Sequence, residues 1–310
     1  MHDSGSTRIT SSRPSGSGLA FVALVVANVC LAFGPWLVRL ADVGPIASAF
    51  WRLLLAVPFL FLAMRLLGQR IPAMKPGLWV MLGFAGLFFA SDLAAWHLGI
   101  LQTKLANATL FGNSPSLMFP IYGFLIARAW PSRGQAAALL LAAFGAALLM
   151  GQSYELSGQN LVGDLLCLLS GAFYTCYFIA MARARLAMGP VPALTLSTMA
   201  GVIPLFLFAL VMGDAIWPQN WTALFLLALF SQVIGQGLMI YALGHFQPLV
   251  IGLALLIQPI VSGAIGWIVY EERLGTLDMI GAVAVAIALV LVRRPEKDAP
   301  SRLAADGSKA

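Results

Sequence analysis

A few ionisable side chains lie within the long apolar stretches of this sequence, and they are the groups that could do chemistry there. Asp92 and Trp96 are four residues apart and would share one helix face, whereas His97 would lie about 140° around the helix from Asp92. A carboxylate beside an aromatic ring could bind a cationic or aromatic ligand, or carry a proton. The alternative for Asp92 is helix packing, with Asn28 as a candidate hydrogen-bond partner. His97 could respond to external pH, or it could simply bond to a loop.

Arg52 is the one basic residue well inside an apolar stretch, next to Trp51. Its guanidinium could be the charge partner of Asp92, or it could contact an anionic group. It could also extend to the aqueous interface beside Asp42. No metal or cofactor is expected, since three cysteines lack ligand-like spacing with histidine or with one another: Cys30, Cys167 and Cys176.

Amide, hydroxyl and phenol groups form a second set of candidates, and some lie beside prolines that interrupt helices. Pro115 and Pro259 each remove a backbone donor and so free a carbonyl one turn earlier, at Phe111 and Leu255. Polar groups beside a broken helix suit a binding cavity. The alternative is hydrogen bonding between helices, worth about 0.6 kcal/mol on average. The candidate binding residues are Asp92, Trp96, Asn107, Asn113, Ser114, Tyr174, Tyr177, Gln232, Gln236 and Gln258.

The composition indicates which elements must position these groups. Of the 310 residues, 60% are apolar and 10% are charged, and the mean hydropathy is +0.90. Soluble proteins carry about 25% charged residues. The composition therefore excludes a soluble domain, a disordered chain and a nucleic-acid-binding protein. Backbone groups in lipid must bond to one another, and continuous apolar runs favour helices over a barrel.

Charge-free stretches predict an all-α membrane protein with ten transmembrane helices joined by short loops. The first apolar run continues to Val38, so we expect a retained span rather than a signal peptide. Residues 1–18 and 294–310 are expected to be disordered cytoplasmic tails. The predicted helices are about 19–38, 45–65, 77–99, 104–127, 133–151, 161–182, 192–213, 221–243, 247–270 and 276–293. The fifth and tenth carry almost no polar group, so we expect them to be peripheral scaffold.

The distribution of Lys and Arg predicts that both termini are cytoplasmic. With that orientation, 14 basic residues lie on the cytoplasmic side and 3 on the other. The net charge of +6 then marks the cytoplasmic face and indicates no acidic partner.

The chain also repeats itself weakly at an offset of about 144 residues, which aligns Pro115 with Pro259 and Asp92 with Gln236. The two copies, 19–151 and 161–293, would hold five spans each. An odd number of spans reverses the orientation of the second copy. The sequence therefore predicts two inverted five-helix repeats, which is an architecture of transporters with the site near the midplane between the halves.

These features resemble the drug/metabolite transporter (DMT) superfamily, in its ten-helix form with two EamA domains. The resemblance rests on residues 91–97 (SDLAAWH), 106–110 (ANATL) with Pro115, and Gln258 with Pro259. Residues 270–274 (YEERL) resemble the family's G-E-R-L signature, whereas residues 128–130 (RAW) stand in its place in the first copy. The resemblance implies two inverted five-helix halves around a central cavity, and movement of small organic solutes, often outward.

We expect a secondary active transporter, a permease for efflux of small metabolites or drugs by alternating access in a bacterial inner membrane. Asp92 and His97 are the candidates for proton coupling. With Arg52 as the only intramembrane cation, a neutral, zwitterionic or cationic solute is favoured over a polyanion. No P-loop motif occurs, so ATP is not expected as a partner. The alternatives are a passive facilitator or channel, and an intramembrane lipid-modifying enzyme, for which H-E-x-x-H and G-x-S-x-G motifs are absent. The sequence leaves the oligomeric state open.

Overall fold

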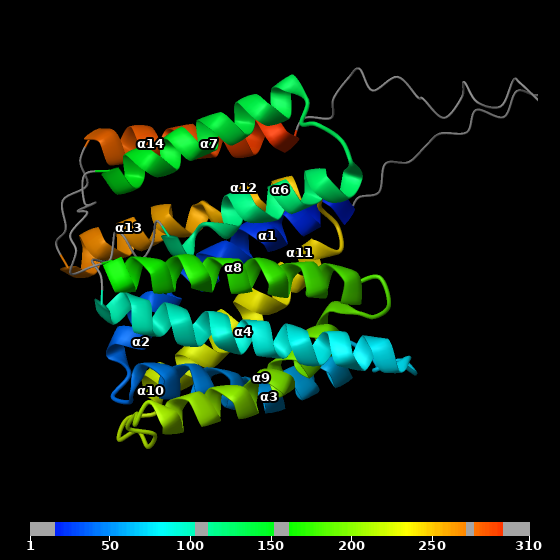
Figure 1. Ribbon diagram of the computed structural model, residues 1–310, viewed down its shortest axis with the longest axis vertical. Helices are drawn as coiled ribbons and strands as arrows, with labels where there is room; N and C mark the ends of the chain where they lie inside the picture. Colours follow the sequence, from blue (N-terminus) through cyan, green and yellow to red (C-terminus); the bar gives the residue numbers. More distant parts are fainter. Residues whose placement is uncertain (1–15, 103–110, 152–160, 271–275, 294–310) are drawn as a thin grey trace, which may run out of the picture.

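The computed structural model describes residues 16–102, 111–151, 161–270 and 276–293, and these ranges form helices and no strand (Figure 1). The all-α prediction is confirmed for them. The elements are α1 (Gly16–Ala32), α2 (Gly34–Leu40), α3 (Pro45–Leu66), α4 (Pro76–Gln102), α6 (Pro115–Ala127), α7 (Arg133–Gly151), α8 (Leu161–Ala184), α9 (Pro190–Val211), α10 (Thr222–Leu226), η1 (Leu227–Gln236), α11 (Gly237–Leu243), α12 (Pro248–Leu255), α13 (Ile257–Tyr270) and α14 (Thr276–Arg293).

Seven segments of the described ranges are long and apolar enough to cross a membrane. They are Gly18–Leu40, Pro45–Leu66, Pro76–Gln102, Leu161–Ala184, Pro190–Val211, Thr222–Leu243 and Pro248–Ile265. These lengths suit a hydrocarbon core about 30 Å thick. The full set of ten spans and their inverted repeat remain predictions.

Three of the predicted helices are interrupted where prolines follow. The first apolar helix breaks at Phe33, two residues before Pro35, and α12 ends at Leu255, four residues before Pro259. The second break falls at Leu255, whose carbonyl receives no hydrogen bond from Pro259 because proline has no backbone N–H. In the segment predicted as 104–127, α6 begins only at Pro115. There the Phe111 carbonyl accepts the Ser114 N–H at 3.1 Å, so a tight turn replaces the bond that the proline removes.

The helix predicted over 221–243 is not a uniform α-helix. Its middle ten residues, Leu227–Gln236, form the π-helix η1 between α10 and α11. A π-helix has wider turns than an α-helix and is frequently found at functional sites. Gln232 and Gln236 lie in this segment, and both side chains are buried. The spacing rule for an α-helix therefore does not describe the positions of these two amides.

The helices stack in layers across the bundle (Figure 1). The pair α7 and α14 forms one outer layer, and α3 and α9 form the opposite one, with α4 and α8 packed together between them. A Cβ atom at Gly145 of α7 would lie 2.8 Å from the Gly281 carbonyl of α14, so only glycine allows this approach. Neither α7 nor α14 lines the cavity described below, as their lack of polar residues predicts.

The two ends of the bundle differ in charge. The loops 67–75, 128–132, 185–189 and 244–247 lie at one end, here called the basic end (right in Figure 1). Loops 41–44 and 212–221 lie at the opposite end and carry Asp42 and Asp214. The basic residues at the basic end are Arg65, Arg70, Lys75, Arg128, Arg133, Arg183, Arg185 and Arg293.

Asp214 fixes the start of α3 from a distant part of the chain. Its Oδ2 accepts the N–H groups of Ile46 and Ala47 at 2.7 and 2.9 Å. A carboxylate is favourable at a helix N-terminus because the first N–H groups have no partner within the helix. A Cβ atom at Gly44 would collide with the Asp214 carboxyl group, so glycine is required at this contact. The contact holds the helix that carries Arg52.

Asp42 makes the reciprocal contact at the same end. Its Oδ2 accepts the N–H groups of Asn220 and Gln219 at 2.9 and 2.8 Å. The bonds from Asn220 and then Gln219 hold the pKa of Asp42 below its ordinary value, although this carboxylate is exposed. Together the two aspartates tie the loop before α3 to the loop after α9.

Replacement of Gly86 by alanine is expected to destabilise the bundle. A Cβ atom there would lie 2.5 Å from the Ala200 Cβ and 2.6 Å from the Ser197 carbonyl, where α4 crosses α9. Overpacking of this kind costs about 1–3 kcal/mol. Gly83 is the matched control on the same helix, because a Cβ atom there would have no neighbour within 4 Å.

Gly83→Ala is expected to raise stability by about 0.5–1 kcal/mol, through helix propensity alone. The measurement is the unfolding midpoint of each variant in detergent. Equal shifts of the unfolding midpoint in Gly86→Ala and Gly83→Ala would contradict the close α4–α9 contact.

Candidate functional site

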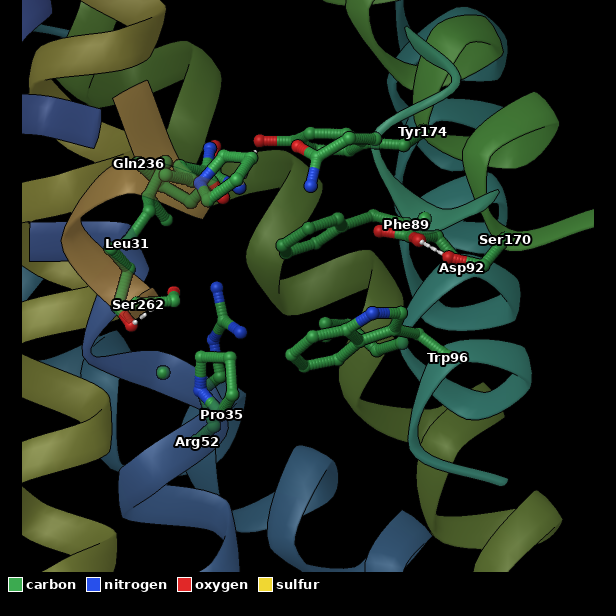
Figure 2. A pocket seen from close by; sticks show the side chains of 17 residues that line it. Leu31, Pro35, Arg52, Phe89, Asp92, Trp96, Ser170, Tyr174, Gln236 and Ser262 are labelled. Carbon is green, nitrogen blue, oxygen red and sulfur yellow. Dashed lines mark hydrogen bonds between the residues drawn. The ribbon is translucent and has the colours of Figure 1, made fainter. Parts of the chain in front are cut away.

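A partly open cavity of about 100 Å³, lined by several buried side chains, lies between helices from both halves of the chain (Figure 2). A water molecule needs about 10–15 Å³ by this measure, so the cavity has room for roughly 7–10 waters. The cavity therefore has room for a small molecule. The lining residues are Leu31, Ala32, Gly34, Pro35, Arg52, Phe89, Asp92, Leu93, Trp96, Gly112, Asn113, Ser170, Tyr174, Gln236, Gln258, Pro259 and Ser262.

The cavity occupies the part of the bundle from its middle to the end remote from the basic loops. Asp92 and Trp96 lie in the second half of α4, which starts at the basic end. Arg52 lies eight residues into α3, which starts at the opposite end. Ser170 lies in the first half of α8, which also starts there.

Asp92 projects from α4 and is almost fully buried. Its Oδ1 accepts a hydrogen bond from the Ser170 hydroxyl of α8 at 2.6 Å, drawn in Figure 2. Asn28, the partner suggested by the sequence, bonds elsewhere: it donates to the Leu24 carbonyl and accepts from Gln258. The suggested Asn28 contact is thus wrong, because α8 is the helix that packs along α4 at this point.

Arg52 lies inside the bundle and not at the aqueous interface, with 5% of its surface exposed. Its Nε donates to the Gln232 side-chain oxygen at 3.2 Å, and Gln232 in turn donates to the Thr198 hydroxyl at 2.9 Å. The guanidinium carbon lies 5.8 Å from the centre of the Phe89 ring, a cation–π distance. Figure 2 shows the guanidinium extending into the cavity.

Asp92 and Arg52 are thus bound to different neutral partners. The carboxylate is held by Ser170 on α8, and the guanidinium is held by Gln232 on η1. Each charged group has hydrogen-bonding capacity left over, because a carboxylate has two acceptor oxygens and a guanidinium has five N–H donors. The cavity therefore offers one anionic and one cationic contact to a small polar molecule.

The side of the cavity toward the basic end is closed by a hydrogen bond and aromatic rings. Gln236 donates to the Tyr174 hydroxyl at 2.9 Å, which joins η1 to α8. One turn further along α8, Tyr177 stacks on Phe89 with ring centres 4.6 Å apart. Phe178 contacts Tyr174 at 4.2 Å between ring centres. These contacts pack the rings of α4 and α8 and the amide of η1 together on this side of the cavity.

Six of the ten candidate binding residues line this cavity, as do Arg52 and Pro259, whereas three do not and one lies outside the described residues. Tyr177 is fully buried in the aromatic stack, and Gln232 lies behind Arg52. Ser114 packs against Gly171 of α8, where any larger residue would collide with it. Asn107 lies outside the described residues. The candidates that line the cavity are Arg52, Asp92, Trp96, Asn113, Tyr174, Gln236, Gln258 and Pro259.

His97 lies away from the cavity, at the contact between α4 and α3. Its Nδ1 is 2.7 Å from the Pro45 carbonyl and 3.2 Å from the Ser48 hydroxyl. A nitrogen this close to a carbonyl carries a hydrogen and donates it. Asp92 bonds to α8 and His97 bonds to α3, in line with their predicted separation around the helix. The alternative given for His97 is a bond to a loop, and the structure places its partner Pro45 at the first residue of α3, directly after loop 41–44.

Several cavity residues were missed by sequence reasoning, and helix spacing contained the signal for two of them. Phe89 precedes Asp92 by three residues and Trp96 by seven, so the three share one face of α4. Ser170 precedes Tyr174 by four residues and shares its face on α8. Each of the two shares a helix face with a residue that the sequence analysis named as a candidate.

Comparisons with known proteins agree with this architecture. Residues 161–294 match the family model described as "EamA-like transporter family", and 29 chains of solved structures match the fold. One of these, described only as "Crystal structure of protein", has a TM-score of 0.75 and 15% sequence identity, covering 91% of this chain and 97% of its own. That identity supports the fold alone. No curated protein matches. The match assigns residues 161–294 to the EamA-like transporter family, and the seven apolar helices of the described ranges are those of a membrane protein.

Proposed function

We propose that this protein is a secondary transporter that exports a small organic solute by alternating access, and that the cavity between the two halves of the chain is its solute site. The observation that carries the proposal is that Asp92 and Arg52 both line one small cavity while bonding to different partners. An ionisable group inside a membrane is costly and is a functional candidate by default. Two ionisable groups of opposite sign, each hydrogen-bonded to a neutral partner, are suited to bind a solute that carries charged groups.

The lining favours a solute with a small polar end and an apolar body. A carboxylate or carbonyl oxygen would accept from Arg52, and a cationic or donor group would bind Asp92. Phe89, Trp96 and Tyr174 supply aromatic walls for the apolar part. A polyanion is disfavoured because Asp92 would repel it. We therefore propose a zwitterionic or neutral solute.

The proposed architecture is ten spans in two inverted five-helix repeats, 19–151 and 161–293. The cavity draws residues from both: α3 and α4 from the first, and α8, η1 and α13 from the second. Transporter sites typically lie at such a repeat interface near the membrane midplane. Alternating access would come from movement of one repeat against the other around this site.

The charge of the two ends supports an orientation for the proposed transporter. Because basic loops are retained in the cytoplasm, we place the basic end on the cytoplasmic side of a bacterial inner membrane. The cavity then faces the outside, and the Gln236–Tyr174 hydrogen bond with Phe178 closes it toward the cytoplasm. Export requires this closure to open and the outer side to close.

Profiling of metabolites tests the proposed function directly. Cells that overproduce the protein should enrich the medium in one or a few small solutes, and cells that produce Asp92→Ala at the same level should not. Media from the two strains that do not differ in any small solute would contradict the proposal.

A further inference from the structure

A second, larger cavity lies at the surface between α6 and α7 at the basic end, well away from the solute site. Its volume is about 540 Å³, and its walls are apolar, with Ile121 and Leu125 on α6 and Leu139 on α7. Arg128 and Trp130, in the loop that joins the two helices, also line it. Leu125 is 71% exposed and Trp130 is 94% exposed, so this groove opens to the surroundings of the bundle.

Arg128 holds an unusual backbone conformation at the end of this groove. Its φ and ψ of 48° and 37° are left-handed, and it is the one non-glycine residue with positive φ among those described. The Arg128 N–H bonds to the Leu125 carbonyl and the Ala129 N–H to the Phe124 carbonyl, both at 3.2 Å. This is the helix ending in which glycine is usual. An arginine is therefore held where glycine would fit with less strain.

The sequence is also unusual here. Residues 128–130 read RAW, where the resemblance to the family led us to expect an acid followed by Arg and Leu. The loops of this end that the structure describes, 67–75, 128–132, 185–189 and 244–247, contain no Asp or Glu. No hydrogen bond joins the Arg128 side chain to the described residues of these loops. Its charge is therefore available to an anion from outside the chain.

We propose that this groove binds an anionic phospholipid, with one acyl chain along Ile121, Leu125 and Leu139 and the phosphate on Arg128. A groove that is apolar along its length and cationic at one end complements a ligand with a long tail and an anionic head. Trp130 lies in the exposed loop at this end of the groove, and tryptophan is enriched at the headgroup level of membrane proteins. The groove between α6 and α7 would therefore recognise a lipid headgroup through Arg128, at a site separate from the solute cavity.

Lipid titration of the purified full-length chain in neutral detergent tests this site. Phosphatidylglycerol and phosphatidylcholine with identical acyl chains are added separately, and the thermal unfolding midpoint is followed against lipid concentration. Phosphatidylglycerol should raise the midpoint at lower concentration than phosphatidylcholine. Arg128→Gly, which relaxes the left-handed turn while removing the charge, should require about fivefold more phosphatidylglycerol for the same shift.

Two further variants separate the site from general charge. Arg128→Lys keeps the charge and should retain the preference for phosphatidylglycerol. Arg133→Gln removes a neighbouring charge that does not line the groove, and it should titrate like the unaltered chain. The proposal is overturned if phosphatidylcholine acts equally, if Arg128→Gly titrates normally, or if inorganic phosphate alone reproduces the shift.

Discussion

Replacement of Asp92 by asparagine is expected to reduce transport driven by a pH gradient by at least about tenfold, because loss of one essential charge-assisted contact costs about 1.5–3 kcal/mol. Asparagine has nearly the same shape and can still accept the Ser170 hydroxyl through its side-chain oxygen, so α4 should remain packed on α8. It cannot carry a proton or a negative charge. The measurement is uptake into proteoliposomes of the solute that profiling identifies, at matched protein content. A native rate in Asp92→Asn would contradict any role for this carboxylate.

Solute exchange without a gradient separates the two roles of Asp92. If the carboxylate carries the coupled proton, Asp92→Asn should still exchange labelled for unlabelled solute across the membrane. If it binds the solute itself, exchange should be lost together with gradient-driven transport. Ser170→Ala is the matched control, because it removes the partner of Asp92 but leaves the acid, and it should retain coupling to the gradient.

Replacement of Arg52 by lysine is expected to raise KM for a carboxylate-bearing solute by about 10–100-fold. Lysine keeps the positive charge but lacks the planar fork that binds a carboxylate with two hydrogen bonds. Lysine also lacks the Arg52 Nε, whose hydrogen bond to Gln232 fixes the guanidinium against Phe89. Loss of a hydrogen bond to a charged group is worth about 1.5–3 kcal/mol, which gives the stated range.

The comparison that checks this expectation is KM for the identified solute and for its amide analogue, in the native protein and in Arg52→Lys. The variant should lose affinity for the acid and change little for the amide. Equal losses for both solutes would indicate that Arg52 supports the fold of the cavity and does not read the carboxylate.

The apolar runs predicted helix positions well, because a span is set by the thickness of the bilayer and interrupted by charge. The helix predicted over 45–65 is Pro45–Leu66, and the one predicted over 133–151 is Arg133–Gly151. The π-helix η1 could not be predicted from the chain, since no residue type in 227–236 specifies wider turns. It depends on how this segment packs against α1 and α3.

The partners of the charged residues were beyond sequence reasoning for a related reason. Periodicity tells which residues share a face of one helix, but it does not tell which helix lies opposite that face. Asp92 therefore had Asn28 as a candidate partner, while the packing of α4 on α8 gives it Ser170. The link from Arg52 to Gln232 spans 180 residues and likewise depends on tertiary packing.

The most direct test of the central claim is whether the identified solute accumulates against its own gradient in proteoliposomes that are acidic inside. For a transporter that exchanges one proton for one solute, a gradient of one pH unit supports accumulation up to about tenfold, since that gradient stores about 1.36 kcal/mol. The unaltered protein is predicted to accumulate the solute above its external concentration and to lose it when the gradient is dissipated. Asp92→Asn should never exceed the external concentration. Equilibration of the unaltered protein to the external concentration, with or without the gradient, would contradict coupled transport and make the protein a passive facilitator.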